Sequence, residues 1–266
     1  MSKLPSCKEI LLDLQDGVLT LTLNRPHKRN AMNSALVMEV MAVFTNIAAD
    51  RSIRMVVMRG AEGNFCSGGD ISGMTDKTMD EAAAAQASWD FNRSFGRMIT
   101  LVNKAPQTVI TLLEGAVLGG GFGLACISDV AIAHKDATFA MPETGLGIIP
   151  AQIAPFVVSR IGLTQARRFA LMGERVNGEV ATELGISHYV VETQAAMEEK
   201  LAYVIHRVRR CAPGANALTK ELILQVGLVE HETLLDKASD DFAASLNSEE
   251  GQEGTQAFME KRKANF

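Results

Sequence analysis

Two glycine-rich turns, each placed directly after an apolar run, constrain the fold of this chain more than any other feature. The first turn, residues 65–71, follows the β-branched run Ile53–Met58, and the second, residues 115–121, follows Thr108–Leu113. Continuous apolar runs of this length are typical of strands buried in a parallel sheet. Glycine at the end of such a strand lets a ligand approach the backbone closely. The pattern therefore predicts two buried strands that end in accessible backbone N–H groups.

The remaining hydrophobic pattern predicts an α/β chain with a helical C-terminal part. Repeated strand–helix–strand order implies a mainly parallel sheet with right-handed crossovers. The 266 residues suffice for one domain with an appended element. Beyond Pro150 the pattern becomes helical, and a helical C-terminal region is expected from about residue 200. The other expected strands are 11–14, 18–23 and 130–133, and the expected helices are 33–49, 79–103 (with Trp89, Phe91, Phe95 and Met98 facing inward), 122–127, 151–161, 164–172, 177–184, 194–210, 214–227, 230–246 and 251–263.

Composition narrows the class of protein. A formal charge of −5 gives no electrostatic attraction for nucleic acid or for an anionic membrane surface. No apolar run approaches the ~18 residues of a membrane-spanning helix, and the N-terminus lacks the hydrophobic region of a secretory signal. The four cysteines are far apart, match no metal-binding spacing and suit a reducing compartment. We therefore expect a cytoplasmic protein that holds no metal and binds neither nucleic acid nor membrane.

The two turns favour stabilisation of a carbonyl oxygen that becomes negatively charged. Gly120 precedes a predicted helix, so its N–H points out of a helix N-terminus, where negative charge is favourable. Gly69 would supply the second donor of an oxyanion hole, in which one donor contributes about 3 kcal/mol to transition-state stabilisation. Two other interpretations stay open, namely tight turns without a chemical role and Cys66 as a nucleophile. A dinucleotide-binding fingerprint is rejected, because its third glycine and the acidic residue that follows are both missing.

These motifs, in this order, resemble the enoyl-CoA hydratase/isomerase (crotonase) family over essentially the whole chain. Residues 24–33 are similar to the family's first CoA-binding turn, and the two glycine-rich turns are similar to its two oxyanion segments. Pro142-Glu143 with residues 145–150 resembles the catalytic-acid segment, and residues 257–266 resemble the family's C-terminus.

The resemblance implies both an architecture and an assembly. The fold class is α/β, with a crotonase-like spiral of βαβ units over residues 1–199 that holds the CoA site and the oxyanion hole. A C-terminal α-helical trimerisation region over residues 200–266 would close the spiral. The implied assembly is a homotrimer or a homohexamer.

The resemblance also implies a role for each matching residue. Gly69 and Gly120 would donate the oxyanion amides, and Glu143 would move the proton at the carbon next to the thioester. CoA is part of the acyl-CoA substrate, its phosphates suit cationic side chains, and no separate cofactor is expected. The implied CoA contacts are Lys28, Arg29, Ser67, Asp70 and Ile71 at the adenine and phosphate end, and Phe258 and Lys261 from a neighbouring subunit.

Glu143 and Gly123 decide which reaction is expected. Glu143 follows a proline in a neutral, apolar loop (residues 144–155) that would desolvate the carboxyl group and raise its pKa into the range of a general acid/base. Gly123 stands where the two-acid hydratases of the family carry their first glutamate, which helps to hold water. The missing side chain would leave room for water or for a bulky acyl chain. Asp76 is an alternative second acid, and the five dispersed histidines are not.

Three functions follow, in order of preference. The first is hydration of a 2-enoyl-CoA thioester through an enolate, with a branched or glutaconyl-type substrate, such as an isohexenylglutaconyl thioester, from leucine or acyclic-terpenoid breakdown. The second is Δ3,Δ2-enoyl-CoA isomerisation with Glu143 as the single proton shuttle. The third is a non-catalytic or RNA-binding protein on the same fold, which the acidic charge and the intact oxyanion turns disfavour.

Overall fold

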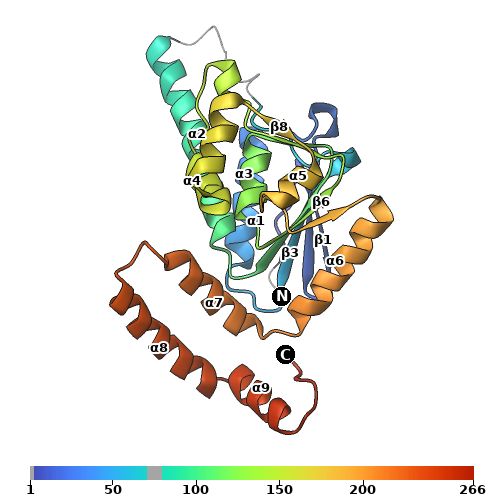
Figure 1. Ribbon diagram of the computed structural model, residues 1–266, viewed down its shortest axis with the longest axis vertical. Coiled ribbons are helices and arrows are strands. Elements are labelled where there is room, and N and C mark those ends of the chain that lie inside the picture. Colours follow the sequence, from blue (N-terminus) through green and yellow to red (C-terminus); the bar gives the residue numbers. More distant parts are fainter. Residues whose placement is uncertain (1–2, 71–79) are drawn as a thin grey trace.

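The computed structural model describes residues 3–70 and 80–266 (Figure 1). Within these residues a mixed sheet has the strand order β1-β2-β3-β4-β6-β9. The first two strands pair antiparallel around the turn at Asp16-Gly17, and the others pair parallel, as the sequence predicts. The strands are β1 (Ile10–Gln15), β2 (Val18–Leu23), β3 (Met55–Gly60), β4 (Thr108–Leu113), β6 (Val130–His134) and β9 (Tyr189–Val191).

Helices cover both faces of this sheet. Helices α1 to α5 lie on one face of the sheet, and α6 lies on the other (Figure 1). Side chains alternate along β3, so Val56 and Met58 join the larger core while Met55 and Val57 join the smaller core under α6. These helices are α1 (Ser34–Ile47), α2 (Glu81–Asn103), α3 (Gly120–Ile127), α4 (Ala154–Met172), α5 (Gly178–Glu183) and α6 (Gln194–Arg209).

A second, smaller sheet positions the two glycine turns. Its strands are β5 (Ala116–Leu118), β7 (Thr138–Ala140) and β8 (Arg175–Val176), with β7 in the centre. The first glycine turn extends this sheet on the other side of β5. The Cys66 N–H donates to the Ala116 carbonyl at 2.8 Å, and the Leu118 N–H donates to the Cys66 carbonyl at 2.9 Å. The small sheet therefore fixes one turn beside the other.

Two details of the helices, the position of Trp89 and the continuity of α4, differ from the expectation. Trp89 was expected to face the core, but it is 56 % exposed, because the first half of the 23-residue α2 extends past the edge of the core. Met98 and Phe95, in the second half, are buried as expected. The two helices expected on either side of residue 162 are joined in α4, where Gly162 has φ +74° and breaks the helical geometry.

Three C-terminal helices form an arm that projects from the core (Figure 1). Helix α6, which crosses residue 200, still packs on the sheet, and the arm begins after it. The Arg54 guanidinium joins arm and core by donating to the carbonyls of Arg209, Cys211 and Phe266. The arm consists of α7 (Pro213–Gln225), α8 (His231–Asn247) and α9 (Glu249–Met259).

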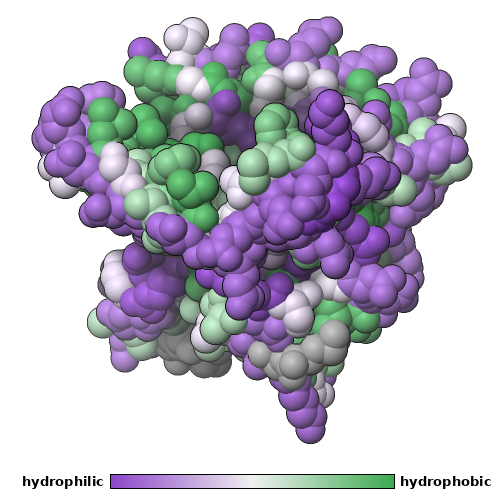
Figure 2. Space-filling view, turned by 90° about the horizontal axis from the view of Figure 1, so that it is seen from below, coloured by the Kyte–Doolittle hydropathy of each residue, from purple (hydrophilic) through white to green (hydrophobic). Residues whose placement is uncertain are grey.

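Apolar side chains of the arm are exposed to solvent. Phe242, Leu228 and Phe258 are 69 %, 82 % and 84 % exposed. A cavity of about 1020 Å³ runs between the three helices, with Leu218, Leu222 and other apolar residues in its lining. Seen from below, hydrophobic residues gather in patches among polar ones (Figure 2). No helix in the described part of the chain has the length and apolar composition to cross a membrane.

Candidate active site

The first glycine turn presents the Gly69 N–H outward. The Met32 N–H donates to the Gly68 carbonyl and the Asp70 N–H donates to the Met32 carbonyl, each at 2.8 Å. In a parallel bridge of this kind the N–H of the residue between the two bonds points away from its partner. Gly69 is exposed, and its N–H has no acceptor among the described residues. This amide is therefore free to bind a ligand.

The second glycine turn presents the Gly120 N–H in a similar way. The Gly119 N–H donates to the Ala140 carbonyl at 3.0 Å, and Gly119 has φ +51° and ψ −116°, a conformation that favours glycine. Helix α3 begins at Gly120, and its first intrahelical bond comes from the Gly123 N–H. The Gly120 N–H is therefore one of the unpaired donors of a helix N-terminus, and it too has no acceptor among the described residues.

The two turns and Glu143 meet at one place. A Cβ atom on Gly119 would lie 3.6 Å from the Gly68 Cα and 2.9 Å from the Glu143 Oε1. A Cβ atom on Gly68 would lie 3.4 Å from the Leu118 carbonyl oxygen. Residues 68, 119 and 143 are far apart in the sequence, but the small sheet and α3 bring their backbone and carboxylate together. The structure thus brings Glu143 and the residues that directly precede the two selected glycines, Gly68 and Gly119, to one place.

A short 3-10 turn over residues 143–146 follows β7 and begins at Glu143. The Glu143 Oε2 is buried and has no hydrogen-bond partner among the described residues. Burial raises the pKa of this carboxyl group above its ordinary value of 4.5, and a backbone hydrogen bond partly opposes the rise. A carboxylate with a raised pKa and a free oxygen can accept and return a proton near neutral pH.

The loop after Glu143 (residues 144–155) was expected to desolvate the carboxyl group. The burial and its effect on the pKa are confirmed, and the part that the loop plays in the burial stays a prediction. In the loop, Leu146, Ile148 and Ile149 are 61 %, 49 % and 74 % exposed, whereas Ile153 is buried. The Ile148 N–H donates to the Glu143 carbonyl.

The position of Gly123 is filled by protein, not by open space. A Cβ atom there would lie 3.0 Å from the Ile153 Cβ and 3.0 Å from the Ile99 Cδ1, and closer still to the Ile153 Cγ2. The interpretation that Gly123 leaves room for water or acyl chain is therefore wrong. Gln152 fixes this wall by donating to the Asn92 Oδ1 at 2.8 Å and accepting from Arg93. Asp76, the alternative acid, lies outside the described residues.

The residues expected at the CoA site fall into two groups. Lys28 and Arg29 are exposed on the loop beside the first turn, and the Ser67 hydroxyl donates to the Lys28 carbonyl at 3.0 Å. The Asp70 carboxylate forms an ion pair with Arg25. Ile71 lies outside the described residues.

The second group lies on the arm. Phe258 and Lys261 are exposed at the end of α9. Figure 1 shows α9 in the arm, away from α3, whose first residue is Gly120. Within one chain, the helix that ends next to these two residues therefore lies away from the second glycine turn.

Sequence reasoning missed two buried polar residues, Arg25 and Asn30, that support the first turn. Arg25 is 8 % exposed and Asn30 is fully buried. The Asn30 amide donates to the carbonyls of Ala61 and Asn64, at 2.9 and 2.6 Å. Both lie in residues 24–33, a segment that was interpreted from the sequence as a CoA-binding turn.

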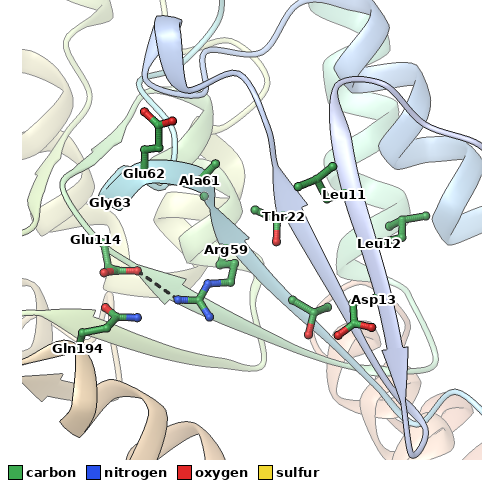
Figure 3. A pocket seen from close by; sticks show the side chains of 12 residues that line it. Leu11, Leu12, Asp13, Thr22, Arg59, Ala61, Glu62, Gly63, Glu114 and Gln194 are labelled. Atoms are coloured by element: carbon green, nitrogen blue, oxygen red, sulfur yellow. Dashed lines mark ion pairs between the residues drawn. The ribbon is translucent and has the colours of Figure 1, made fainter.

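Other chemistries find no support in the described residues. Burial raises the pKa of the Cys66 thiol to about 12, so Cys66 is not a nucleophile at neutral pH. No group of histidine, cysteine, aspartate or glutamate within residues 3–70 and 80–266 is arranged to hold a metal ion. A cavity of about 680 Å³ beside β1, β2 and β3 includes none of the predicted site residues (Figure 3). In it, Arg59 points toward Glu114, 3.8 Å away.

Comparison with known proteins agrees with this geometry. Residues 13–266 match the family model described as enoyl-CoA hydratase/isomerase. The 2,3-dehydroadipyl-CoA hydratase of Escherichia coli is 31 % identical over 97 % of this chain and 98 % of its own length. The 1,2-epoxyphenylacetyl-CoA isomerase of the same organism is 29 % identical over 97 % of each chain. The solved structure of Pseudomonas aeruginosa AtuE is 52 % identical, with a TM-score of 0.94 over 97 % of this chain and 98 % of its own.

Proposed function

The chain belongs to the enoyl-CoA hydratase/isomerase family, and from this premise we propose that it hydrates a 2-enoyl-CoA thioester with Glu143 as acid/base. Water adds through its oxygen to C3, and the electron pair of the double bond moves onto the thioester oxygen as an enolate. The N–H groups of Gly69 and Gly120 stabilise that oxygen. Glu143 accepts a proton from the water and delivers it to C2, so the product is a 3-hydroxyacyl-CoA.

One observation carries this proposal. The N–H groups of Gly69 and Gly120 have no acceptor among the described residues, and the glycines before them meet beside the Oε1 of Glu143. The other oxygen of this carboxylate, Oε2, is buried and has no hydrogen-bond partner among those residues. A buried polar atom is normally paired, so this oxygen points to a ligand that pairs with it. A polarised thioester next to a transferable proton matches both kinds of group.

A second candidate, Δ3,Δ2-enoyl-CoA isomerisation, is favoured by the packing at Gly123. Ile153 and Ile99 occupy the space that a second glutamate side chain would need. Isomerisation needs only one base, because the same group removes and returns the proton. Glu143 would remove a proton from C2 of a 3-enoyl thioester and return it to C4. The likeness to an enzyme named as an isomerase is compatible with this alternative.

A panel of acyl-CoA thioesters separates the two reactions. The panel contains crotonyl-CoA, a branched 2-enoyl-CoA, a glutaconyl-type 2-enoyl-CoA such as isohexenylglutaconyl-CoA, and a 3-enoyl-CoA. Hydration adds the mass of one water and removes the absorbance of the conjugated thioester. Isomerisation leaves the mass unchanged and creates that absorbance from the 3-enoyl substrate. Conversion of the 3-enoyl substrate alone would contradict the hydratase proposal, and no turnover on any thioester would favour a binding protein.

We also propose that the substrate site is completed by a second copy of the chain. Lys28, Arg29, Ser67 and Ile71 would line the CoA of one subunit, and Phe258 and Lys261 would reach it from a neighbour in a homotrimer or homohexamer. The exposed apolar residues of the arm support association. Sedimentation of the full chain tests this assembly, and Phe242→Asp is expected to dissociate it. A monomeric wild-type chain with full activity would contradict the proposal.

A further inference from the structure

We infer that Asp70 and the buried Arg25 act as positioning residues that set the direction of the Gly69 N–H. The inference rests on the proposed function in one respect, namely that Gly69 donates to the thioester oxygen. It gives Asp70 a different role from the CoA contact that the family resemblance implies. The carboxylate would act on catalysis through the turn that it terminates, without touching the substrate.

The Arg25 guanidinium joins three segments of the chain. Its Nε lies 2.9 Å from the Glu9 Oε2, and its Nη1 lies 2.9 Å from the Asp70 Oδ2 and also donates to the Ala31 carbonyl. The Arg25 and Asp70 side chains are only 10 % and 11 % exposed. A charge buried to this extent is stable only when it is paired and hydrogen-bonded. The rigid planar guanidinium therefore fixes where the Asp70 carboxylate lies.

The same loop holds the other end of the turn. Asn64 precedes the turn, and its carbonyl accepts from the Asn30 side chain at 2.6 Å. The Asn30 Oδ1 in turn accepts from the Arg25 N–H at 2.9 Å. Residues 65–69 are therefore bracketed by Asn30 at their start and by Arg25 at their end. Both anchors are in the loop that follows β2.

Steric packing restrains Gly69 little. Among the described residues, a Cβ atom on Gly69 would meet only the Phe91 ring, at an ordinary distance of 3.7 Å, and the preceding Gly68 has φ +105°. Glycines can rotate where packing does not stop them. Polar contacts hold the peptide plane between Gly68 and Gly69, whose N–H is the donor. Its carbonyl accepts from the Met32 N–H, and the Arg25 guanidinium binds Asp70 and the Ala31 carbonyl, one on each strand of this bridge. Loss of the Arg25–Asp70 pair would loosen the bridge and let the plane tilt.

The test compares two variants that each remove one carboxylate charge from the same guanidinium. Asp70→Asn breaks the pair at the turn, and Glu9→Gln breaks the pair on the opposite side, where the backbone leads into β1. We expect Asp70→Asn to lower kcat by about 10- to 100-fold with KM for the enoyl-CoA within about twofold of wild type. Glu9→Gln should keep kcat within about threefold.

A second readout does not require turnover. The infrared carbonyl stretch of a bound saturated acyl-CoA, labelled with ¹³C at the thioester carbonyl, reports how strongly the oxyanion donors polarise that bond. We expect the shift on binding to shrink in Asp70→Asn and to stay unchanged in Glu9→Gln. Should Asp70→Asn fail to fold, Arg25→Lys replaces it, because an ammonium group cannot hold both carboxylates in the planar geometry of guanidinium. It should lower kcat and the carbonyl shift in the same way.

Three results would overturn the inference. A raised KM or a weaker affinity for CoA at unchanged kcat would make Asp70 a CoA contact. Equal losses of kcat in Asp70→Asn and Glu9→Gln would leave the network a purely structural role. An unchanged carbonyl shift in Asp70→Asn would show that the turn keeps its direction. Failure of the proposed function looks different, since wild type would then hydrate no 2-enoyl-CoA while the carbonyl shifts still distinguished the two variants.

Discussion

The two glycine turns place one N–H each at the same site, but the protein holds them by different means. The first turn is held by polar contacts, with the Arg25–Asp70 pair at its end, and among the described residues only the Phe91 ring, at 3.7 Å, lies near the position of a Cβ atom on Gly69. The second is held by packing. A Cβ atom on Gly120 would lie 2.7 Å from the Met32 Cε and 3.1 Å from two atoms of the Phe95 ring.

This difference predicts which kind of substitution disturbs each N–H donor. A group fixed by close packing responds to added volume, because a filled core cannot absorb a methyl group without a shift. A group fixed by buried ion pairs and hydrogen bonds responds instead to the loss of charge. The same substitution, glycine to alanine, should therefore cost much activity in the second turn and little in the first. Gly120→Ala and Gly69→Ala test that contrast.

Among substitutions of the glycines, the largest effect is expected from Gly120→Ala. The added methyl group would collide with Met32 and Phe95 and move the start of α3, which displaces the donor N–H. Loss of one oxyanion donor lowers kcat by about 10²- to 10³-fold. Steady-state kinetics on the best thioester of the panel measures this loss. Activity close to wild type would mean that packing does not hold the second turn.

A smaller effect, on stability, is expected from Gly123→Glu. The glutamate would have to displace Ile153 and Ile99, and overpacking of this kind costs roughly 1–3 kcal/mol. Thermal unfolding should show a lowered Tm, and adding Ile153→Ala should restore part of it. A single variant as stable as wild type would contradict the account of a filled wall.

Glu143→Gln should change stability in a pH-dependent way. Because burial raises the pKa of Glu143 in the folded state, folding favours the protonated form. The ionised form therefore lowers wild-type stability increasingly as pH rises above the unfolded-state pKa, near 4.5. The glutamine variant should be more stable than wild type at neutral pH, and the advantage should disappear below about pH 4.5. Unfolding curves across this range test the sign, which a constant difference would contradict.

The smallest effect is expected from Gly69→Ala. Among the described residues its Cβ atom would meet only Phe91, at 3.7 Å, and the backbone there does not have the positive φ of Gly68. Activity should stay within about threefold of wild type, and the free energy of unfolding should change by no more than a few tenths of a kcal/mol. A loss as large as that of Gly120→Ala would remove the contrast between the two turns.

Local signals in the sequence were sufficient to predict much of the fold. The Asp16-Gly17 turn gave β1 and β2 with their pairing, and Asn33, whose side chain accepts from the Leu36 N–H, marked the start of α1. The three-residue strands β5, β7 and β9 were missed, because such short strands depend on partners from distant parts of the chain. Trp89 was misplaced, since periodicity shows which face of a helix is apolar but not where the core ends.

The residues of the candidate site could be predicted from the sequence only where they belong to a recognisable motif. Gly69, Gly120 and Glu143 came from motifs, and the structure brings them together. Arg25 and Asn30 could not be recognised, because a polar residue in a loop has the same sequence signature whether it is solvated or buried. The filling of Gly123 by Ile153 also depends on a tertiary contact across 30 positions that no local pattern reports.

The central claim is that the two amides polarise the thioester while Glu143 moves the proton, and one measurement on Glu143→Gln tests it directly. The variant is mixed with a ¹³C-carbonyl-labelled enoyl-CoA, and the carbonyl stretch and the turnover are recorded on the same sample. We predict a carbonyl shift equal to that of wild type and a loss of turnover of about 10²- to 10⁴-fold. Full turnover in the variant, or a wild-type complex whose carbonyl stretch does not shift, would contradict the account.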